Sequence, residues 1–227
     1  MQRNELTFPQ GSFLGRISQE SWEQLSAKWT VKNYRPGHFL ISADDDGLDV
    51  FFVIDGTIKA SIYTDGGREV SFLTLSNGDC LGEFSAIDEA PRSCDAITET
   101  DCIVARISAQ GFRDLLKTNP DMSFVLLSLL VGHLRRLDKR VVDFNSKSAD
   151  VRLREKLLEL AEAYNKNNEA LIEKPPTQTQ LAAFVFSSRE SVAREMGRMR
   201  KAGVLGRKRR ALHFPSVTGL RDYIDNQ

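Results

Sequence analysis

The stretch that decides the fold reads Gly82-Glu83-Phe84-Ser85-Ala86-Ile87-Asp88-Glu89-Ala90-Pro91-Arg92-Ser93. The guanidinium of Arg92 is a planar set of N–H donors that can bind two oxygens of one phosphate, and Ser93 adds a hydroxyl and a backbone N–H beside it. Glu83 supplies an acceptor for a sugar hydroxyl. Gly82 lacks a Cβ where backbone and ligand approach closely, and Ser85 helps to begin a helical turn whose N–H groups face an anion. This combination suits a phosphodiester that lies next to a sugar.

A simpler interpretation is that Glu83 and Arg92 form an ion pair across a surface hairpin. An isolated glycine–glutamate pair with a distant arginine would favour that interpretation. Here small and apolar residues follow Glu83, and a serine directly follows Arg92. This order and spacing favour the ligand site.

The sequence around this stretch predicts short strands. Residues 34–106 are divided by turn-forming sequences at intervals of about ten residues, which is typical of a β-barrel or roll. The turns are Arg35-Pro36-Gly37, Asp44–Gly47, Asp55-Gly56, Asp65-Gly66-Gly67 and Asn77-Gly78-Asp79. The apolar run Val50–Ile54 predicts a buried strand, and Ile58, Ala60 and Ile62 alternate with polar residues. Ile103–Ile107 is expected to be the last strand.

Charge is distributed unevenly along the 227 residues. Residues 1–120 hold 11 Lys and Arg against 18 Asp and Glu, residues 121–174 hold 10 against 9, and residues 175–227 hold 10 against 4. An acidic part followed by a basic part indicates separate modules, and the basic one is expected to contact a polyanion, most simply nucleic acid. We predict a ligand-binding domain over 1–120, a dimerisation helix with a hinge over 121–147, and a DNA-binding domain over 148–227.

Several classes of protein are not supported by the composition. The three cysteines, Cys80, Cys94 and Cys102, form no CxxC pair, and the three histidines are far apart, so neither a disulfide framework nor a metal site is expected. No basic and apolar leader is present, and no apolar run reaches the ~20 residues of a membrane span. We therefore expect a cytoplasmic protein with no membrane partner. Because no nucleophile is paired with a base, we expect no enzymatic activity.

A long helix is predicted to begin at Asn119-Pro120-Asp121, where Asn can cap, Pro suits the first helical position and Asp lies in the first turn. Its apolar residues alternate spacings of three and four, the pattern of a coiled-coil seam. We call this set the seam: Leu127, Leu130, Leu134, Leu137, Val141 and Phe144. The seam favours a parallel homodimer over a helix that packs only on its own barrel, although some of residues 124–126 are expected to pack there.

The apolar pattern is lost at Asn145–Ser148, which we interpret as a hinge. Residues 150–164 predict an amphipathic helix, and residues 165–176 predict a loop. Two capping boxes follow, Thr177–Gln180 and Ser187–Glu190, and each marks the start of a short helix. Two short helices joined by a brief turn form a helix-turn-helix.

The second short helix carries Arg189 and Glu190 in its first turn and Arg194 one turn later. In a major groove, Arg can bind guanine O6 and N7, and Glu can accept from cytosine N4, each pair giving roughly 1–3 kcal/mol of discrimination. The alternative is an i,i+4 surface pair between Glu190 and Arg194. That alternative leaves unexplained the neighbouring basic residues, which include Lys208. Residues 204–214 predict two short strands with a basic tip, a wing that rests on phosphates.

With both modules in view, the chain resembles the CRP/FNR superfamily of transcription regulators, in its cyclic AMP receptor branch, over about residues 15–215. The resemblance implies an α+β fold: an N-terminal cyclic-nucleotide-binding β-barrel (jelly roll), a long dimerisation helix and a C-terminal winged helix-turn-helix. It implies cyclic AMP rather than cyclic GMP as effector, with no metal. The expected partners are a second copy of the chain, double-stranded DNA at a palindrome with TGTGA-like half-sites, and RNA polymerase.

The resemblance also assigns roles to particular residues. Glu83 would hold the ribose 2′-hydroxyl, while Arg92 and Ser93 would hold the cyclic phosphate, within a cassette that includes Gly82, Phe84 and Ser85. The stretch Ser188-Arg189-Glu190-Ser191-Val192-Ala193-Arg194 resembles the family's recognition helix. Base reading is therefore expected of Arg189, Glu190 and Arg194, and DNA contacts of Thr177, Thr179, Ser188 and Lys208.

One departure affects the nucleotide base. The family's cyclic AMP receptor holds adenine with a Thr-Ser pair on the dimer helix, and here the corresponding stretch is Arg135-Arg136-Leu137-Asp138-Lys139-Arg140-Val141. One register places Lys139 and Arg140 at the base, and the other places Arg140 and Val141 there. Two further hypotheses remain open: the same DNA-binding role with a different effector or none, and a nucleotide-sensing regulator of a partner protein.

Overall fold

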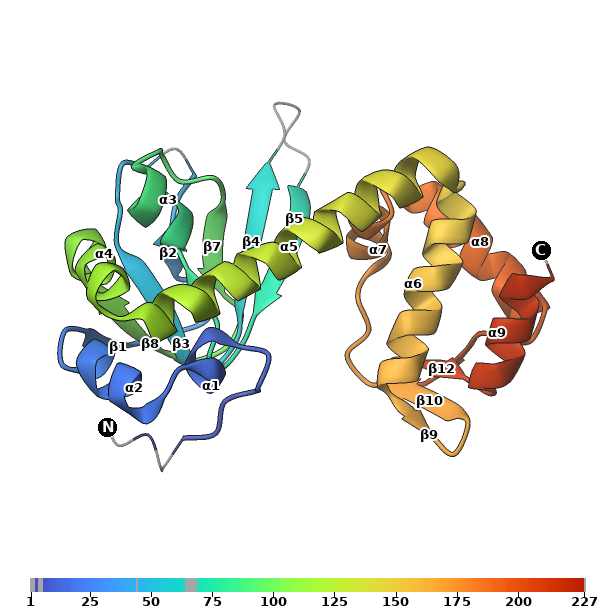
Figure 1. Cartoon of the computed structure of the whole chain (residues 1–227). Helices are drawn as coiled ribbons and strands as arrows, with labels where there is room; N and C mark the ends of the chain where they lie inside the picture. Colours follow the sequence, from blue (N-terminus) through green and yellow to red (C-terminus); the bar gives the residue numbers. More distant parts are fainter. Residues whose placement is uncertain (1–2, 4–5, 44, 64–68, 227) are drawn as a thin grey trace. The chain divides into compact units, whose positions relative to one another are not determined.

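The computed structural model describes residues 3, 6–43, 45–63 and 69–226, with the side chains of residues 62, 63, 69–72 and 140 left out. The chain divides into two compact units, Met1–Arg135 and Arg136–Gln227 (Figure 1). The first contains two β-sheets with helices, and the second contains helices with a small sheet. This architecture confirms the expected fold class. The turn predicted at Asp65-Gly66-Gly67 lies outside the described residues.

The strands of the first unit form two antiparallel sheets, ordered β1-β8-β3-β6 and β2-β7-β4-β5. Their bounds are β1 Thr30–Tyr34, β2 Phe39–Ile41, β3 Val50–Asp55, β4 Ile58–Tyr63, β5 Glu69–Leu75, β6 Cys80–Leu81, β7 Asp95–Thr98 and β8 Cys102–Ile107. One apolar cluster takes residues from both sheets, and a second lies between the other face of β3 and the helices. The run Val50–Ile54 is apolar throughout because β3 is buried on both faces.

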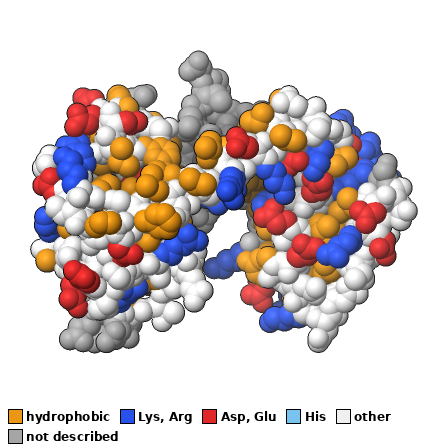
Figure 2. All heavy atoms as spheres, viewed as in Figure 1, with side chains coloured by type: hydrophobic (Ala, Val, Ile, Leu, Met, Phe, Trp, Pro, Cys, Tyr) orange, Lys and Arg blue, Asp and Glu red, His pale blue; other side chains and the backbone are white. Residues whose placement is uncertain are grey.

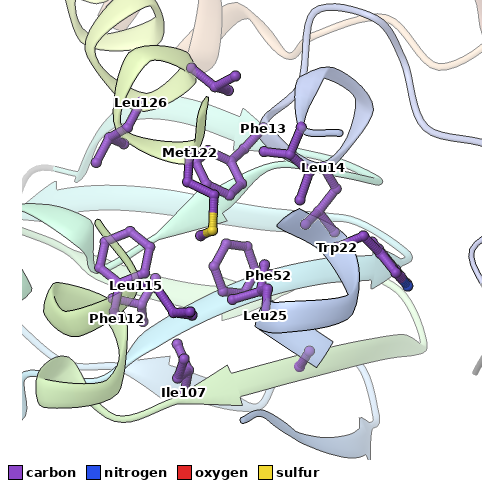
Figure 3. Close-up of a cluster of buried hydrophobic side chains, with 14 of the residues drawn as sticks. Phe13, Leu14, Trp22, Leu25, Phe52, Ile107, Phe112, Leu115, Met122 and Leu126 are labelled. Atoms are coloured by element: carbon purple, nitrogen blue, oxygen red, sulfur yellow. The ribbon is translucent and has the colours of Figure 1, made fainter. Parts of the chain in front are cut away.

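Four short helices accompany these sheets: α1 Phe13–Arg16, α2 Gln19–Ser26, α3 Glu83–Asp88 and α4 Ala109–Thr118. The sequence pattern predicts the turn at α3 but not α1, α2 or α4. These helices supply much of the core shown in Figure 3, where Phe13 and Phe112 lie next to Phe52 and Trp22 belongs to the same cluster. The rings of Phe13 and Phe52 lie 5.5 Å apart.

Helix α5 spans Pro120–Ser146, and the side chain of Asn119 accepts the backbone N–H of Met122 at 3.1 Å. The predicted helix start is therefore confirmed. Val125 and Leu126 are buried in the core of the first unit, whereas Phe124 is 72% exposed. Most of the seam is also exposed, and Figure 2 shows hydrophobic side chains gathered along this part of α5. The apolar residues of α5 thus divide into a face that packs within the chain and a face that does not.

The second unit contains α6 Ala149–Ala163, α7 Gln178–Phe184, α8 Arg189–Lys201 and α9 Val217–Asp225, with a sheet ordered β11-β12-β10-β9. Its strands are β9 Asn165–Lys166, β10 Glu169–Ile172, β11 Gly206–Lys208 and β12 Ala211–Phe214. The predicted helices and the wing strands β11 and β12 are confirmed. Val192, Met196 and Met199 lie on the buried face of α8.

Two details of the prediction were wrong. Residues 165–176 are not simply a loop, because they contain the hairpin β9–β10, whose left-handed turn residues Asn167 and Asn168 have φ 55° and 67°. Ala170 and Ile172 are buried and their neighbours along β10 are exposed. The strand pairs with β12 in antiparallel register. The second capping box is also displaced, since Ser188 is the N-cap and its hydroxyl accepts the Ser191 N–H. The first box, Thr177 with Gln180, is confirmed.

Candidate functional site

The cassette begins at Gly82, which precedes α3 in a left-handed conformation with φ 85°. A Cβ at this position would lie 2.5 Å from Nη1 of Arg92 and 2.7 Å from the carbonyl oxygen of Asp49. Both the conformation and the space therefore require glycine. Ser85 and Ala86 are buried on α3, while Phe84 is 47% exposed. The sequence thus folds the cassette as a tight turn closed over an arginine.

Arg92 is the buried cation of this turn, with only 5% of its surface exposed. Its Nη1 donates to the Gly82 carbonyl at 3.0 Å, and its Nη2 donates to the Asp49 carbonyl at 2.6 Å. Burial lowers the pKa of Arg92, and the neighbouring acidic groups, Asp49 first, oppose that change. The guanidinium has five N–H donors. Its two hydrogen bonds to the carbonyls of Gly82 and Asp49 use two of these donors. Arg92 therefore fits an anionic ligand such as a cyclic phosphate.

Glu83 occupies the start of α3, one residue after Gly82. Burial raises the pKa of its carboxyl to about 7, and the opposing effects of a backbone hydrogen bond and of Arg92 are smaller. A carboxyl group in this position can accept a hydrogen bond from a sugar hydroxyl. The structure therefore brings Gly82, Glu83 and Arg92 together, and Ser93 is exposed directly after Arg92.

Two further arginines, which the sequence analysis did not select, hold the elements around the cassette. Arg113 of α4 donates to the carbonyl of Ala86 at 3.0 Å and pairs with Glu89 at 3.0 Å, which fixes α3. Arg106 of β8 pairs with the carboxylate of Asp49, the residue whose carbonyl accepts from Arg92. No sequence spacing marks these contacts, because they join residues that are far apart along the chain.

The predicted base-contacting residues lie on the later part of α5. Lys139 is exposed, and the side chain of Arg140 lies outside the described residues. Both residues belong to the second compact unit, whereas the cassette belongs to the first. Their assignment to the nucleotide base stays a prediction.

The predicted DNA-binding residues lie at the start of the helix-turn-helix and on the wing. Thr177, Thr179, Ser188, Arg189 and Glu190 are exposed at the starts of α7 and α8. Arg194 is exposed one turn further along α8 and donates to the Ser191 hydroxyl at 3.0 Å. The structure thus presents the first turns of α8 to solvent, which is the end of a recognition helix that enters a major groove.

Lys208 on the wing has an acidic partner within the same unit. Its Nζ donates to Glu169 at 2.5 Å, and Nε2 of His213 lies 2.7 Å from the same oxygen. These hydrogen bonds lower the pKa of Glu169, and the bond from Lys208 has the larger effect. A phosphate would have to compete with Glu169 for Lys208, whereas Arg207, Arg209 and Arg210 are exposed on the same wing.

A buried ion pair holds α8 against α6, and the sequence analysis missed it. Glu195 is fully buried and accepts from Nε of Arg154 at 2.5 Å and from Nη1 of Arg198 at 2.8 Å. Arg198 also pairs with Asp150 at 3.0 Å. The only signal in the sequence was a glutamate on the otherwise apolar face of α8, next to Met196. The ion pair fixes the orientation of α8. It therefore determines which side chains of α8 face the solvent.

Two family models match two separate segments of the chain. The family model of the cyclic nucleotide-binding domain matches residues 31–119, and that of the Crp-like helix-turn-helix domain matches residues 151–223. The chain belongs to the CRP/FNR family. As a member of this family it is a CRP-like transcription regulator with a cyclic-nucleotide-binding domain and a helix-turn-helix DNA-binding domain. The family consists of transcription regulators and not of enzymes.

Individual CRP/FNR relatives cover most of the chain. The CRP-like cAMP-activated global transcriptional regulator of Mycobacterium tuberculosis is 25% identical over 191 residues, 83% of this chain and 85% of the relative. The cAMP-activated global transcriptional regulator CRP of Haemophilus influenzae is 29% identical over 161 residues, 68% of this chain and 70% of the relative. The structure of the c-di-GMP responsive global regulator CLP of Xanthomonas campestris matches with a TM-score of 0.73 at 21% identity, covering 88% and 100% of the two chains. This last likeness concerns the fold.

Among the helices of the described residues, none combines the length and the apolar character needed to cross a membrane. Within the same residues, no group of three or more His, Cys, Asp or Glu side chains is placed to hold a metal ion.

Proposed function

We propose that the chain is a cytoplasmic homodimer whose affinity for a palindromic TGTGA-like DNA site is controlled by a cyclic nucleotide, cyclic AMP rather than cyclic GMP. The observation that carries the proposal is the buried Arg92 in a turn that only glycine can close at position 82. Burying a cation costs free energy unless an anion or hydrogen bonds compensate its charge. A phosphodiester is an anion that this arrangement fits. The cyclic AMP-activated relatives support the choice of nucleotide.

The exposed seam supports the homodimer. Leu134 and Leu137 are 59% and 53% exposed, and Val141 is 61% exposed. Exposed apolar residues at coiled-coil spacing are stabilised when a second copy of the same helix covers them. RNA polymerase remains a further expected partner, because regulators of this family act on transcription.

Control requires that the nucleotide bind the DNA-competent state more tightly than the other state. Moving an equilibrium from 1:99 to 99:1 needs ~5.5 kcal/mol of differential affinity. Charge-assisted hydrogen bonds contribute about 1.5–3 kcal/mol each, so contacts of Arg92 in two subunits are of the right order. Lys139 and Arg140 are the residues we propose to reach the base.

The first test is calorimetric titration of cyclic AMP, and separately of cyclic GMP, into nucleotide-free protein. Binding of cyclic AMP at about one molecule per subunit would support the proposal. Binding of cyclic GMP alone would reassign the effector, and no heat from either at millimolar concentration would favour the second candidate. That candidate is the same DNA-binding role with another effector or none, and it is favoured by the missing hydroxyl pair on α5.

The raised pKa of Glu83 predicts that nucleotide affinity depends on pH. If the carboxylate form accepts the ribose hydroxyl, affinity should increase by up to about tenfold between about pH 6 and about pH 8, because Glu83 loses its proton near pH 7. The measurement is calorimetric Kd across this range. The control is Glu83→Gln, which should bind more weakly and without this pH dependence. A wild-type affinity that falls with rising pH would contradict the role given to Glu83.

Base selection by α8 predicts that Glu190→Ala relaxes sequence specificity. Discrimination at one base pair of each half-site should fall by about 1–3 kcal/mol, while the salt dependence of DNA binding stays unchanged, because Glu190 is proposed to contact a base and no phosphate. Arg210→Ala on the wing is the matched control, and it should weaken binding to all sequences and reduce the salt slope by about one. Equal loss of affinity for every sequence in Glu190→Ala would contradict base reading.

The remaining hypothesis, regulation of a partner protein, is tested by the same DNA titrations. Salt-dependent binding that distinguishes the palindrome from a scrambled duplex would exclude it, since a protein-docking surface has no reason to select a DNA sequence.

A further inference from the structure

The turn between α7 and α8 contains a residue in an unusual conformation. Phe186 has φ 49°, in the left-handed region that bulky residues rarely adopt. Turns of helix-turn-helix motifs often contain glycine, which adopts this conformation without strain. Burial does not explain the phenylalanine, because its side chain is 53% exposed. Strain that persists at one residue points to a function for its side chain.

The ring of Phe186 contacts the end of helix α5. The rings of Phe144 and Phe186 lie 5.7 Å apart at 76°, an edge-to-face arrangement that aromatic pairs favour. Phe144 is also the last residue of the seam. One aromatic side chain of the turn before α8 therefore contacts the helix that we propose to form the dimer.

Arg152 of α6 joins the same two segments. Its Nε and Nη2 donate to the Val185 carbonyl at 3.1 and 2.8 Å, directly before Phe186. Its Nη1 donates to the Lys147 carbonyl at 2.5 Å, just after α5. The guanidinium carbon also lies 5.0 Å from the centre of the Phe144 ring. Val185 is buried, and Arg152 gives its carbonyl a hydrogen-bonding partner at the end of α7, where helix carbonyls need partners outside the helix.

We propose that Phe186 is a positioning residue which, with Phe144 and Arg152, transmits the orientation of the last turn of α5 to the start of the recognition helix α8. The inference rests on the proposed function, in which a nucleotide acts through α5, and it assigns the regulatory step within the second unit. In this proposal a phenylalanine occupies the left-handed position in spite of its backbone strain because its ring makes the link to α5. A glycine there would keep the turn and remove the link.

Hydrogen exchange of the full-length protein tests the link without any ligand. Phe144→Ala should speed exchange of the amides at 185–187, which bond to carbonyls of α7, and it should do so although the mutation lies about 40 residues away. Val142→Ala is the matched control, because Val142 is 62% exposed on the same helix and should leave these amides unchanged. In a Phe186→Gly background, Phe144→Ala should have a smaller effect, because only the contact through Arg152 then remains. Equal exchange in Phe144→Ala and Val142→Ala would overturn the inference.

DNA affinity with and without cyclic AMP tests the regulatory consequence. Phe186→Gly should remain folded with thermal stability close to that of the wild type, because the removed backbone strain offsets part of the lost ring contact, and yet its ratio of DNA Kd values without and with nucleotide should fall several-fold toward one. A variant that is merely misfolded would lose stability as well. A full response in Phe186→Gly would overturn the inference. If the wild type itself did not respond, the proposed function would fail, and the hydrogen-exchange result would still decide whether the link exists.

Discussion

Replacing Arg92 with alanine is expected to weaken cyclic nucleotide binding by about 100-fold or more and to abolish nucleotide control of DNA binding. The guanidinium is proposed to make two charge-assisted hydrogen bonds with the phosphate, and bonds of this kind contribute about 1.5–3 kcal/mol each. Arg92 is the arginine that donates to the Gly82 carbonyl, whereas Arg113 holds α3 through Ala86 and Glu89. Calorimetry gives the affinity, and a DNA shift assay with and without nucleotide gives the response.

Two control variants separate ligand binding from the structure of the cassette. Arg106→Ala removes an exposed arginine that pairs with the Asp49 carboxylate, so it perturbs the same residue without removing the buried cation. It should bind nucleotide nearly as well as the wild type. Arg92→Lys keeps a charge but loses the planar donor set, so its affinity should be intermediate. All three variants should retain salt-sensitive binding to non-specific DNA, and an unchanged nucleotide response in Arg92→Ala would reject the cassette as the effector site.

The parts of the fold that the sequence predicted are those in which local chemistry determines the conformation. Gly82 before Glu83, the cap at Asn119 and the capping box at Thr177 each act over three or four residues, and the structure has a turn or a helix start at each. The interior strand β3 was equally visible, because burial on both faces makes its sequence apolar throughout. The residues of the candidate site, Glu83 and Arg92, lie within one short segment, so the sequence already suggests that they lie together, and their role as a ligand site stays a prediction.

The parts that sequence analysis missed depend on contacts between distant segments. Helices α1 and α2 are short, and their apolar residues Phe13 and Trp22 are explained only by the core that they complete around Phe52. Strand β10 forms because Ala170 and Ile172 pack against β12, about 40 residues later in the chain. The separation of Arg154 and Glu195 in the sequence gives no indication that they pair. They pair because α6 packs on α8.

Removing one partner of this buried pair should strongly destabilise the second compact unit. Glu195→Ala is expected to destabilise the second compact unit by about 3–5 kcal/mol, because it leaves the buried Arg154 without its carboxylate partner. The double variant Arg154→Met with Glu195→Leu should recover most of this loss, since apolar side chains of similar volume can replace a buried pair at little cost. Asp150→Ala is the control, because Asp150 pairs with Arg198 at the surface and should contribute less than about 1 kcal/mol.

The two units provide an internal reference for this measurement. Both tryptophans, Trp22 and Trp29, lie in the first unit, so tryptophan fluorescence follows its unfolding, and far-UV circular dichroism also includes the helices α6–α9 of the second. In urea, unfolding of the second unit should appear as a change in circular dichroism without a change in fluorescence. Glu195→Ala should move this change to a lower urea concentration and leave the midpoint of the fluorescence change in place. A double variant as unstable as Glu195→Ala would mean that Glu195 acts through packing rather than through its charge. Recovery of stability with weakened DNA binding would instead show that the buried pair is kept because it fixes the outward face of α8, where Arg189, Glu190 and Arg194 are exposed.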